Sequence, residues 1–270
     1  MIISDQYQFV FIHIPKNAGM EVRSLIQYLD ETKGSFTNRI EQHPVLGDID
    51  YVHLPLGIIE RYFKNEYEKI LNYKTFAIVR DPAERFVSSF SQHLRQTGKK
   101  PIHKMTRREQ VRELQVIVDK LRRLRSQEIL PYELVHFTPQ CDYIFNGDNR
   151  IVDKLFLTNE MDKVEKYIST LLGKSVAFKE GSRANPTYCY KNIFFRVLFE
   201  SFRPIYRLLK DWIPERILMS VRNLVFKKGS NSYIEILNNK VLLEFVHDYY
   251  QKDFEIYFGF EQVANGVRYE

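Results

Sequence analysis

A lysine between an expected strand and an expected helix is the first residue of this chain that could do chemistry. An apolar stretch, residues 8–14, runs into a short loop that contains Lys16 and Gly19, and apolar residues then recur at helical spacing. The backbone N–H groups and the positive end of such a helix attract phosphate or another anion, and Lys16 adds a full charge. The spacing of a Walker A loop is absent. An ordinary turn with a surface lysine is the alternative interpretation.

A second basic residue follows another expected strand, residues 75–79. Arg80 comes directly after it, Asp81 and Pro82 then give a strong signal for the start of a helix, and Ser88 lies eight positions after the arginine. Open α/β sheets bind ligands at the carboxyl ends of their strands, and the planar guanidinium suits a phosphate. The alternative is that Arg80 pairs with a nearby carboxylate such as Glu84.

The two loops together resemble those of the sulfotransferases that use 3′-phosphoadenosine-5′-phosphosulfate (PAPS), in particular the carbohydrate branch. Those proteins carry Pro-Lys-Thr-Ala/Gly-Gly-Thr-Ser for the 5′-phosphosulfate and Arg-Asp-Pro…Arg-Phe…Ser for the 3′-phosphate. Here the stretches are Pro15-Lys16-Asn17-Ala18-Gly19-Met20-Glu21 and Arg80-Asp81-Pro82-Ala83-Glu84-Arg85-Phe86-Val87-Ser88. Residues 53–57, 136–140, 185–187 and 249–257 are also similar to that family. Only residues 94–130 and 190–235 lack a counterpart.

The resemblance implies transfer of a sulfuryl group from PAPS to a hydroxyl or amine of a carbohydrate, such as a polysaccharide or a lipid-linked glycan. It implies no metal. Lys16 would stabilise the oxygen that leaves with the 5′-phosphate. The residues that it assigns to donor binding are Lys16, Asn17, Ala18, Gly19, Met20, Arg80, Ser88, Arg183, Asn185 and Thr187.

A hydroxyl acceptor needs a general base, and His53 is the first candidate. We expect residues 50–53 to form a short strand with His53 at its end, and a histidine with a pKa near working pH suits proton removal. A purely structural histidine is the alternative. Glu21 is the second candidate base, because a carboxylate beside the sulfuryl site could itself take the proton.

Met20 and Glu21 depart from the family pattern, which has Thr-Ser at these positions. Two hydroxyl donors are lost, and Glu21 brings a negative charge that opposes anion binding by roughly 1–4 kcal/mol, depending on the local dielectric. Two alternatives therefore stay open. One is a non-catalytic module that binds glycan or membrane on a degenerate sulfotransferase scaffold. The other is a nucleotide-dependent kinase, although no Walker loop or Mg²⁺ ligand set is visible.

The net charge of +6 is concentrated in two segments. Residues 94–126 hold eleven basic and three acidic residues, and residues 196–228 hold eight basic and three acidic residues. The first segment is either a solvated helix face or a platform for an acidic acceptor. The second, residues 195–228, mixes arginines with large apolar residues. It is either a packed insertion or a peripheral membrane contact. No motif for nucleic acid accompanies the charge.

Alternating strands and helices predict the fold. The expected strands are residues 8–14, 50–53, 75–79 and 154–157, and the expected helices are 20–30, 83–94, 108–126, 160–172, 190–209, 215–226 and 238–250. This order predicts an α/β three-layer, P-loop-like fold with a central parallel sheet and helices on both faces. We expect one domain, residues 1–270, with basic helical insertions at about 94–130 and 190–235. Without a signal sequence or membrane-spanning run, we expect a bacterial-type, cytoplasmic enzyme, peripheral at the inner membrane surface.

Overall fold

The computed structural model describes residues 1–37, 40–178, 188–190, 226–228 and 240–264. The chain divides into two compact units, one of Met1–Ala184 with Leu237–Glu270 and one of Asn185–Ile236. In the second unit, the described residues form two antiparallel strands, β9 (Tyr188–Tyr190) and β10 (Phe226–Lys228). All the other elements that the structure describes belong to the first unit.

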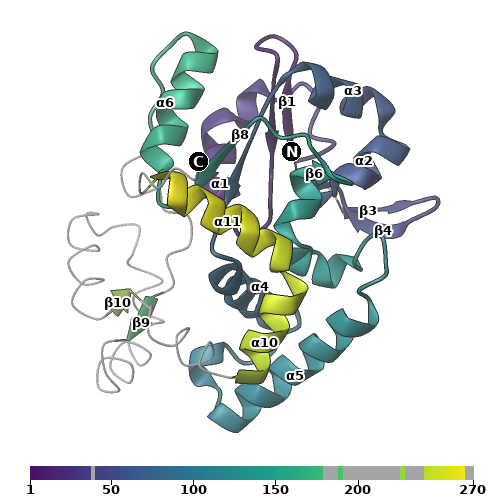
Figure 1. Ribbon diagram of the computed structural model, residues 1–270, viewed down its shortest axis with the longest axis vertical. Helices are drawn as coiled ribbons and strands as arrows, with labels where there is room; N and C mark the ends of the chain where they lie inside the picture. The colour runs from purple at the N-terminus through teal and green to yellow at the C-terminus, as the bar shows by residue number, and fades with distance from the viewer. Residues whose placement is uncertain (38–39, 179–187, 191–225, 229–239, 265–270) are drawn as a thin grey trace, which may run out of the picture. The chain divides into compact units, whose positions relative to one another are not determined.

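A four-stranded sheet lies at the centre of the first unit (Figure 1). Its order is β1 (Ile2–Ser4), β2 (Phe9–Ile12), β5 (Lys74–Val79) and β8 (Lys154–Leu157). The last three strands are parallel, whereas β1 is antiparallel to β2. A few residues connect β1 to β2, and a parallel pair would need a crossover of about a dozen residues or more. The expected sheet is therefore parallel only in part.

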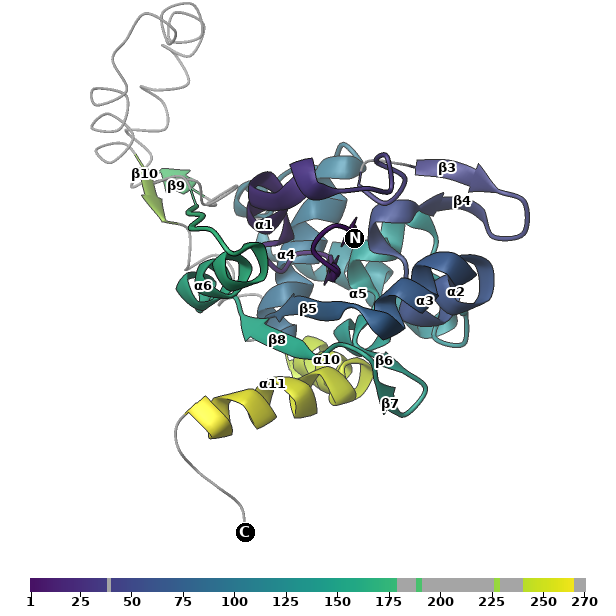
Figure 2. The ribbon, with the colours of Figure 1, turned by 90° about the horizontal axis from the view of Figure 1, so that it is seen from above.

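Both faces of this sheet are buried, as the apolar runs in its strands require. On one face Phe9, Phe11 and Phe76 pack with residues of α1 (Gly19–Ile26) and α6 (Met161–Leu172). On the other, Val10, Ile12 and Val79 pack with residues of α2 (Leu56–Tyr62) and α3 (Lys64–Asn72). Figure 2 shows α1 and α6 on a different side of the strands from α2 and α3. The result is a mixed α/β unit with an apolar core on each face of the sheet.

Two longer helices follow from clear capping signals. The Asp81 carboxylate accepts a hydrogen bond of 2.8 Å from the Glu84 N–H, and Pro82 occupies the first turn of α4 (Pro82–Gln96). A capping box of Thr106 and Glu109 begins α5 (Arg107–Arg123). Near the C-terminus, α10 (Lys240–Tyr249) contacts both α4 and α5, and α11 (Gln251–Ala264) contacts α4.

Shorter elements complete the unit. The hairpins are β3 (Ile40–His43) with β4 (Gly47–Asp50) and β6 (Phe145–Asn146) with β7 (Asn149–Arg150). The 3₁₀ turns are η1 (Gln27–Leu29), η2 (Tyr51–His53), η3 (Ile102–Lys104), η4 (Tyr132–Phe137) and η5 (Gln140–Tyr143). Among the described helices, none is both long and apolar enough to cross a membrane.

The expected strand at residues 50–53 is wrong beyond its first residue. Asp50 ends β4, and its side chain then accepts a hydrogen bond of 2.9 Å from the Val52 N–H, which closes the chain into the η2 turn. The two helices expected at 190–209 and 215–226 fall mostly outside the described residues. Where the structure describes them, Tyr190 and Phe226 belong to strands instead. Most of the expected membrane contact, residues 195–228, also lies outside the described residues.

Candidate functional site

The loop between β2 and α1 has an unusual backbone. Lys16 and Ala18 have φ values of 69° and 58°, in the left-handed region that residues other than glycine rarely adopt. Gly19 is the first residue of α1, and a Cβ added there would lie 2.0 Å from the ring of His13. Because that ring packs directly on the helix start, only glycine fits at this position. The backbone of the loop is thus held in one strained shape.

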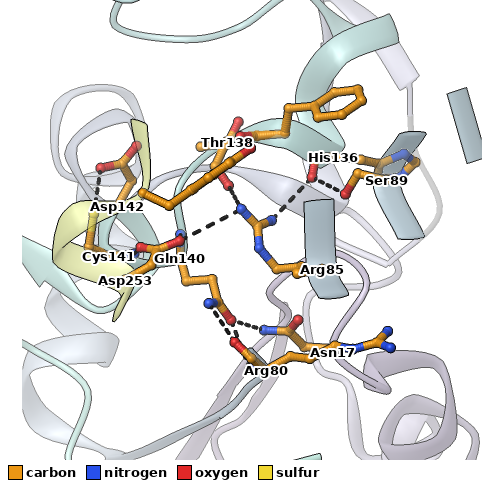
Figure 3. A network of polar contacts seen from close by, with 12 residues as sticks. Asn17, Arg80, Arg85, Ser89, His136, Thr138, Gln140, Cys141, Asp142 and Asp253 are labelled. Carbon is orange, nitrogen blue, oxygen red and sulfur yellow. Dashed lines mark hydrogen bonds and ion pairs between the residues drawn. The ribbon is translucent and has the colours of Figure 1, made fainter. Parts of the chain in front are cut away.

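A glutamine side chain connects this loop to the end of β5 (Figure 3). The Gln140 amide oxygen accepts hydrogen bonds from Asn17 Nδ2 (2.5 Å) and from the Arg80 N–H (3.0 Å). Its amide nitrogen donates to the Arg80 carbonyl at 2.9 Å, and Asn17 Nδ2 also donates to the Ile78 carbonyl at 2.8 Å. One amide group therefore holds the two loops that carry Lys16 and Arg80 in register.

Gln140 is itself held by a buried carboxylate from α11. Asp253 accepts hydrogen bonds of 2.8 Å from the backbone N–H groups of both Gln140 and Cys141. The guanidinium of Arg85 lies 3.8 Å from the same carboxylate, and both side chains are fully buried. Removing one partner of a buried ion pair leaves an uncompensated charge and costs about 3–5 kcal/mol.

Arg85 also holds the backbone at the end of the η4 turn. It donates to the carbonyls of His136 (3.1 Å) and Thr138 (2.8 Å), and the Ser89 hydroxyl donates to the same His136 carbonyl at 2.7 Å. These bonds join α4 to the η4 turn (Figure 3). They fix the backbone that carries the His136 ring.

The charges of two arginines act on Lys16, which follows the carboxyl end of β2. Burial, and then the positive charges of Arg95 and Arg80, lower the pKa of Lys16 to about 8. Arg80 pairs with Glu84, its Nη2 lying 3.0 Å from Oε2, which is the alternative contact expected for this arginine. A bound anion would stabilise the positive charge of Lys16, which burial and the two arginines disfavour. The arrangement therefore suits a ligand with several negative charges.

Arg95 is a residue of this site that the sequence motifs did not indicate. It lies seven positions after Ser88 on α4, which is two helical turns, so the two residues share one face. Ser88 is half-buried, and the described residues provide no hydrogen-bond partner for its hydroxyl. The spacing of Glu84, Ser88 and Arg95 along the helix was the signal that could have identified it.

Three histidines lie together next to the cations. The ring centroids of His13 and His53 are 4.7 Å apart, and those of His53 and His136 are 5.4 Å apart. His53 Nδ1 lies 3.1 Å from the His13 carbonyl, which can only accept, so Nδ1 carries the proton and Nε2 has the free lone pair. The three rings form one connected group beside the lysine loop.

Burial changes the acid–base properties of these rings. It is the main cause that lowers the pKa of His53 and of His136 to about 3, and the charge of Lys16 contributes to both. The pKa of His13 also lies well below its usual value, mainly through burial. The expectation of a His53 pKa near working pH is therefore wrong for the empty site, because the residue is buried in a turn rather than exposed at a strand end.

The other predicted residues are placed less directly. Glu21 lies half-buried in the first turn of α1, and Met20 beside it is 53% exposed. The Asn17 side chain is buried against protein partners, which leaves the backbone of residues 16–20 for any ligand. Arg183, Asn185 and Thr187 lie outside the described residues, so their assignment to donor binding stays a prediction.

Comparison with known proteins agrees with this geometry. Residues 1–149 match the model of the Sulfotransferase family. The chain belongs to the sulfotransferase family. The matched region includes Lys16, His53, Arg80, Ser88 and Gln140, whereas Asp253 lies beyond it. Neither a curated protein nor a solved structure matches the chain.

We predict that Gln140→Met destabilises this sulfotransferase by about 2–4 kcal/mol, because it leaves polar groups of Arg80 and Asn17 without their partner. Chemical denaturation measures the change. Gln115→Met on the exposed face of α5 is the matched control and should change the unfolding free energy little. Equal effects of the two substitutions would show that the amide does not hold the loops.

We also predict loss of stability in acid. The unfolded chain protonates its histidines below about pH 6.5, whereas His13, His53 and His136 resist protonation when folded. The unfolding free energy should therefore stay level above about pH 6.5 and fall below it, by up to about 1.4 kcal/mol per pH unit for each ring.

Denaturation at several pH values tests this origin. His136→Gln should make the decline less steep, whereas His247→Gln, at an exposed position of α10, should leave it unchanged. An identical decline in wild type and His136→Gln would contradict the assignment.

Proposed function

We propose that this sulfotransferase moves a sulfuryl group from PAPS to a hydroxyl or amine of a carbohydrate acceptor. The observation that carries the proposal is the position of Lys16 and Arg80, which follow the ends of two adjacent parallel strands, with the charges of Arg80 and Arg95 both acting on Lys16. A donor with phosphates at both ends of its ribose supplies the negative charges that such a site lacks. The mostly parallel sheet, covered on both faces, supports a P-loop-like arrangement.

The residues then take separate roles in the transfer. The acceptor oxygen attacks sulfur while the bond from sulfur to the 5′-phosphate oxygen breaks, and charge builds on that leaving oxygen. Lys16 stabilises it, and backbone N–H groups of residues 16–20 hold the 5′-phosphate. Arg80 and Ser88 hold the 3′-phosphate and so fix the position of the donor. Catalysis is positioning and electrostatic stabilisation, and needs no metal.

His53 is the proposed general base. Its Nε2 lone pair is free because Nδ1 donates to the His13 carbonyl. The ring is a weak base, because burial lowers its pKa and the charge of Lys16 lowers it further. Donor phosphates beside Lys16 offset that charge and raise the pKa of His53 toward a useful value. Glu21, half-buried at the start of α1, is the alternative base.

We propose an acidic acceptor on the basis of α5. Arg107, Arg108 and Arg112 line a surface pocket of about 800 Å³ together with Val111 and Val116. No ion pair of these three arginines occurs with any residue in the described part of the chain. A uronate-bearing or sulfated glycan, free or lipid-linked, fits such a face. Peripheral attachment at a membrane through residues 195–228 is a further proposal that the described residues do not address.

Arg80→Ala should weaken binding of 3′,5′-diphosphoadenosine (PAP) by about 1.5–3 kcal/mol, the worth of a charge-assisted hydrogen bond. Binding of adenosine 5′-phosphate, which lacks the 3′-phosphate, should change much less. Isothermal calorimetry measures both ligands, and ATP should bind weakly to the wild type.

The matched control for this substitution is Glu84→Gln, which removes the carboxylate that pairs with Arg80. It should leave PAP binding unchanged or strengthen it. If Arg80→Ala weakens the two nucleotides equally, the arginine does not bind the 3′-phosphate. Preference for ATP over PAP would favour the kinase alternative.

His53→Gln should reduce turnover by roughly 10²–10⁴-fold, the usual effect of losing a general base, with little change in PAP affinity. PAP binding also shows that the variant is folded. Glu21→Gln is the comparison: it removes a negative charge near the phosphates, so donor binding should strengthen while turnover persists. The opposite result, with Glu21→Gln inactive and His53→Gln active, would transfer the role of base to Glu21.

A further inference from the structure

An aspartate and two histidines converge beside the lysine loop in a way that sulfuryl transfer does not require. One ligand atom each from Asp50, His53 and His136 lies within 4.8 Å of the other two. His53 is buried, and the other two residues are half-buried. They come from three places in the chain: the end of β4, the η2 turn and the η4 turn.

We propose that Asp50, His53 and His136 bind one divalent transition-metal ion of the Zn²⁺ class. Two imidazole nitrogens and one carboxylate oxygen are a ligand set that suits Zn²⁺ or Co²⁺ and does not suit Mg²⁺ or Ca²⁺, which prefer oxygen. Three protein ligands leave a fourth position open, as in zinc sites that bind a further molecule.

The separations are compatible with coordination after a small adjustment. Ligands of a tetrahedral zinc ion with bonds of roughly 2.0–2.2 Å lie about 3.4 Å apart. The atoms here lie within 4.8 Å of one another, so side-chain rotation would have to bring them closer by at most about 1.4 Å.

Two of the ligand side chains are held by contacts of the kind that supports metal sites, and the backbone of the third is fixed. The His53 Nδ1–H donates to the His13 carbonyl, which directs Nε2 as the ligand atom. The His136 backbone carbonyl is held by Arg85 and Ser89. Asp50 uses Oδ1 to accept from the Val52 N–H, so its second oxygen is available for an ion.

Two consequences distinguish this site from an ordinary surface cluster. The charge of Lys16 reaches both histidines and opposes a bound cation, so removing that charge should strengthen ion binding. An ion also uses the Nε2 lone pair of His53, the same pair that a general base needs. A bound ion and proton removal by His53 therefore exclude each other, and Zn²⁺ should inhibit sulfuryl transfer.

Titration of the purified full-length protein with Co²⁺, followed by its visible absorption, tests the proposal. We expect one equivalent of Co²⁺ to give the intense visible bands of a low-coordinate site, and Zn²⁺ to displace it. Asp50→Asn keeps the acceptor for Val52 and removes one charged ligand, and it should weaken binding by roughly tenfold or more. His136→Gln should do the same, and Lys16→Met should strengthen binding severalfold.

The matched control is His247→Gln, which alters an exposed histidine on α10 and should leave the titration unchanged. Absence of the visible bands, or equal affinity in the wild type and Asp50→Asn, would overturn the proposal. Circular dichroism shows that each variant is folded, and Asp50→Asn decides the matter if His136→Gln does not fold. The titration contains no PAP, so its result does not depend on the proposed donor.

Discussion

The site depends on one constraint, the hydrogen bonding of a single buried amide. Gln140 bonds at once to Asn17 in the loop after β2 and to both backbone polar groups of Arg80 after β5. A donor with two phosphate groups must meet both loops, so their relative position decides whether it fits. Asp253 holds the backbone of Gln140 and lies beyond residues 1–149, which match the family. The C-terminal helix is therefore part of the framework that positions the site.

The electrostatics of the site favour the binding of an anion. Lys16 is half-buried, and the charges of two arginines act on it, so its lowered pKa reflects the free energy that its charge costs there. The ion pair with Glu84 balances part of the positive charge of Arg80. That pair is partly exposed, and such ion pairs contribute only about 0–1 kcal/mol. A phosphate can replace Glu84 at little cost, so the ion pair and a ligand role for Arg80 are compatible.

Local signals made the sequence informative about some parts and not others. The apolar runs of β5 and β8 and the Asp-Pro start of α4 depend on neighbouring residues, and the structure confirms them. The turn at residues 51–53 depends on where the Asp50 side chain points, which no periodicity reveals. The contacts of Gln140 span 60 and 123 residues, and burial sets the acidity of His53. Such properties exist only once the chain has folded.

Burial of the histidines gives the proposed mechanism an order of events. A ring with a pKa of about 3 removes protons poorly, so His53 by itself is a weak base. Burial is the main cause of this low pKa, and Lys16 is one of the charges that add to it. In the proposed mechanism the phosphates of a bound donor offset that charge, so proton removal would follow donor binding. The same neutral rings leave a lone pair for a metal ion when no donor is bound, so both proposals rest on one feature, the burial of His53 beside the lysine loop.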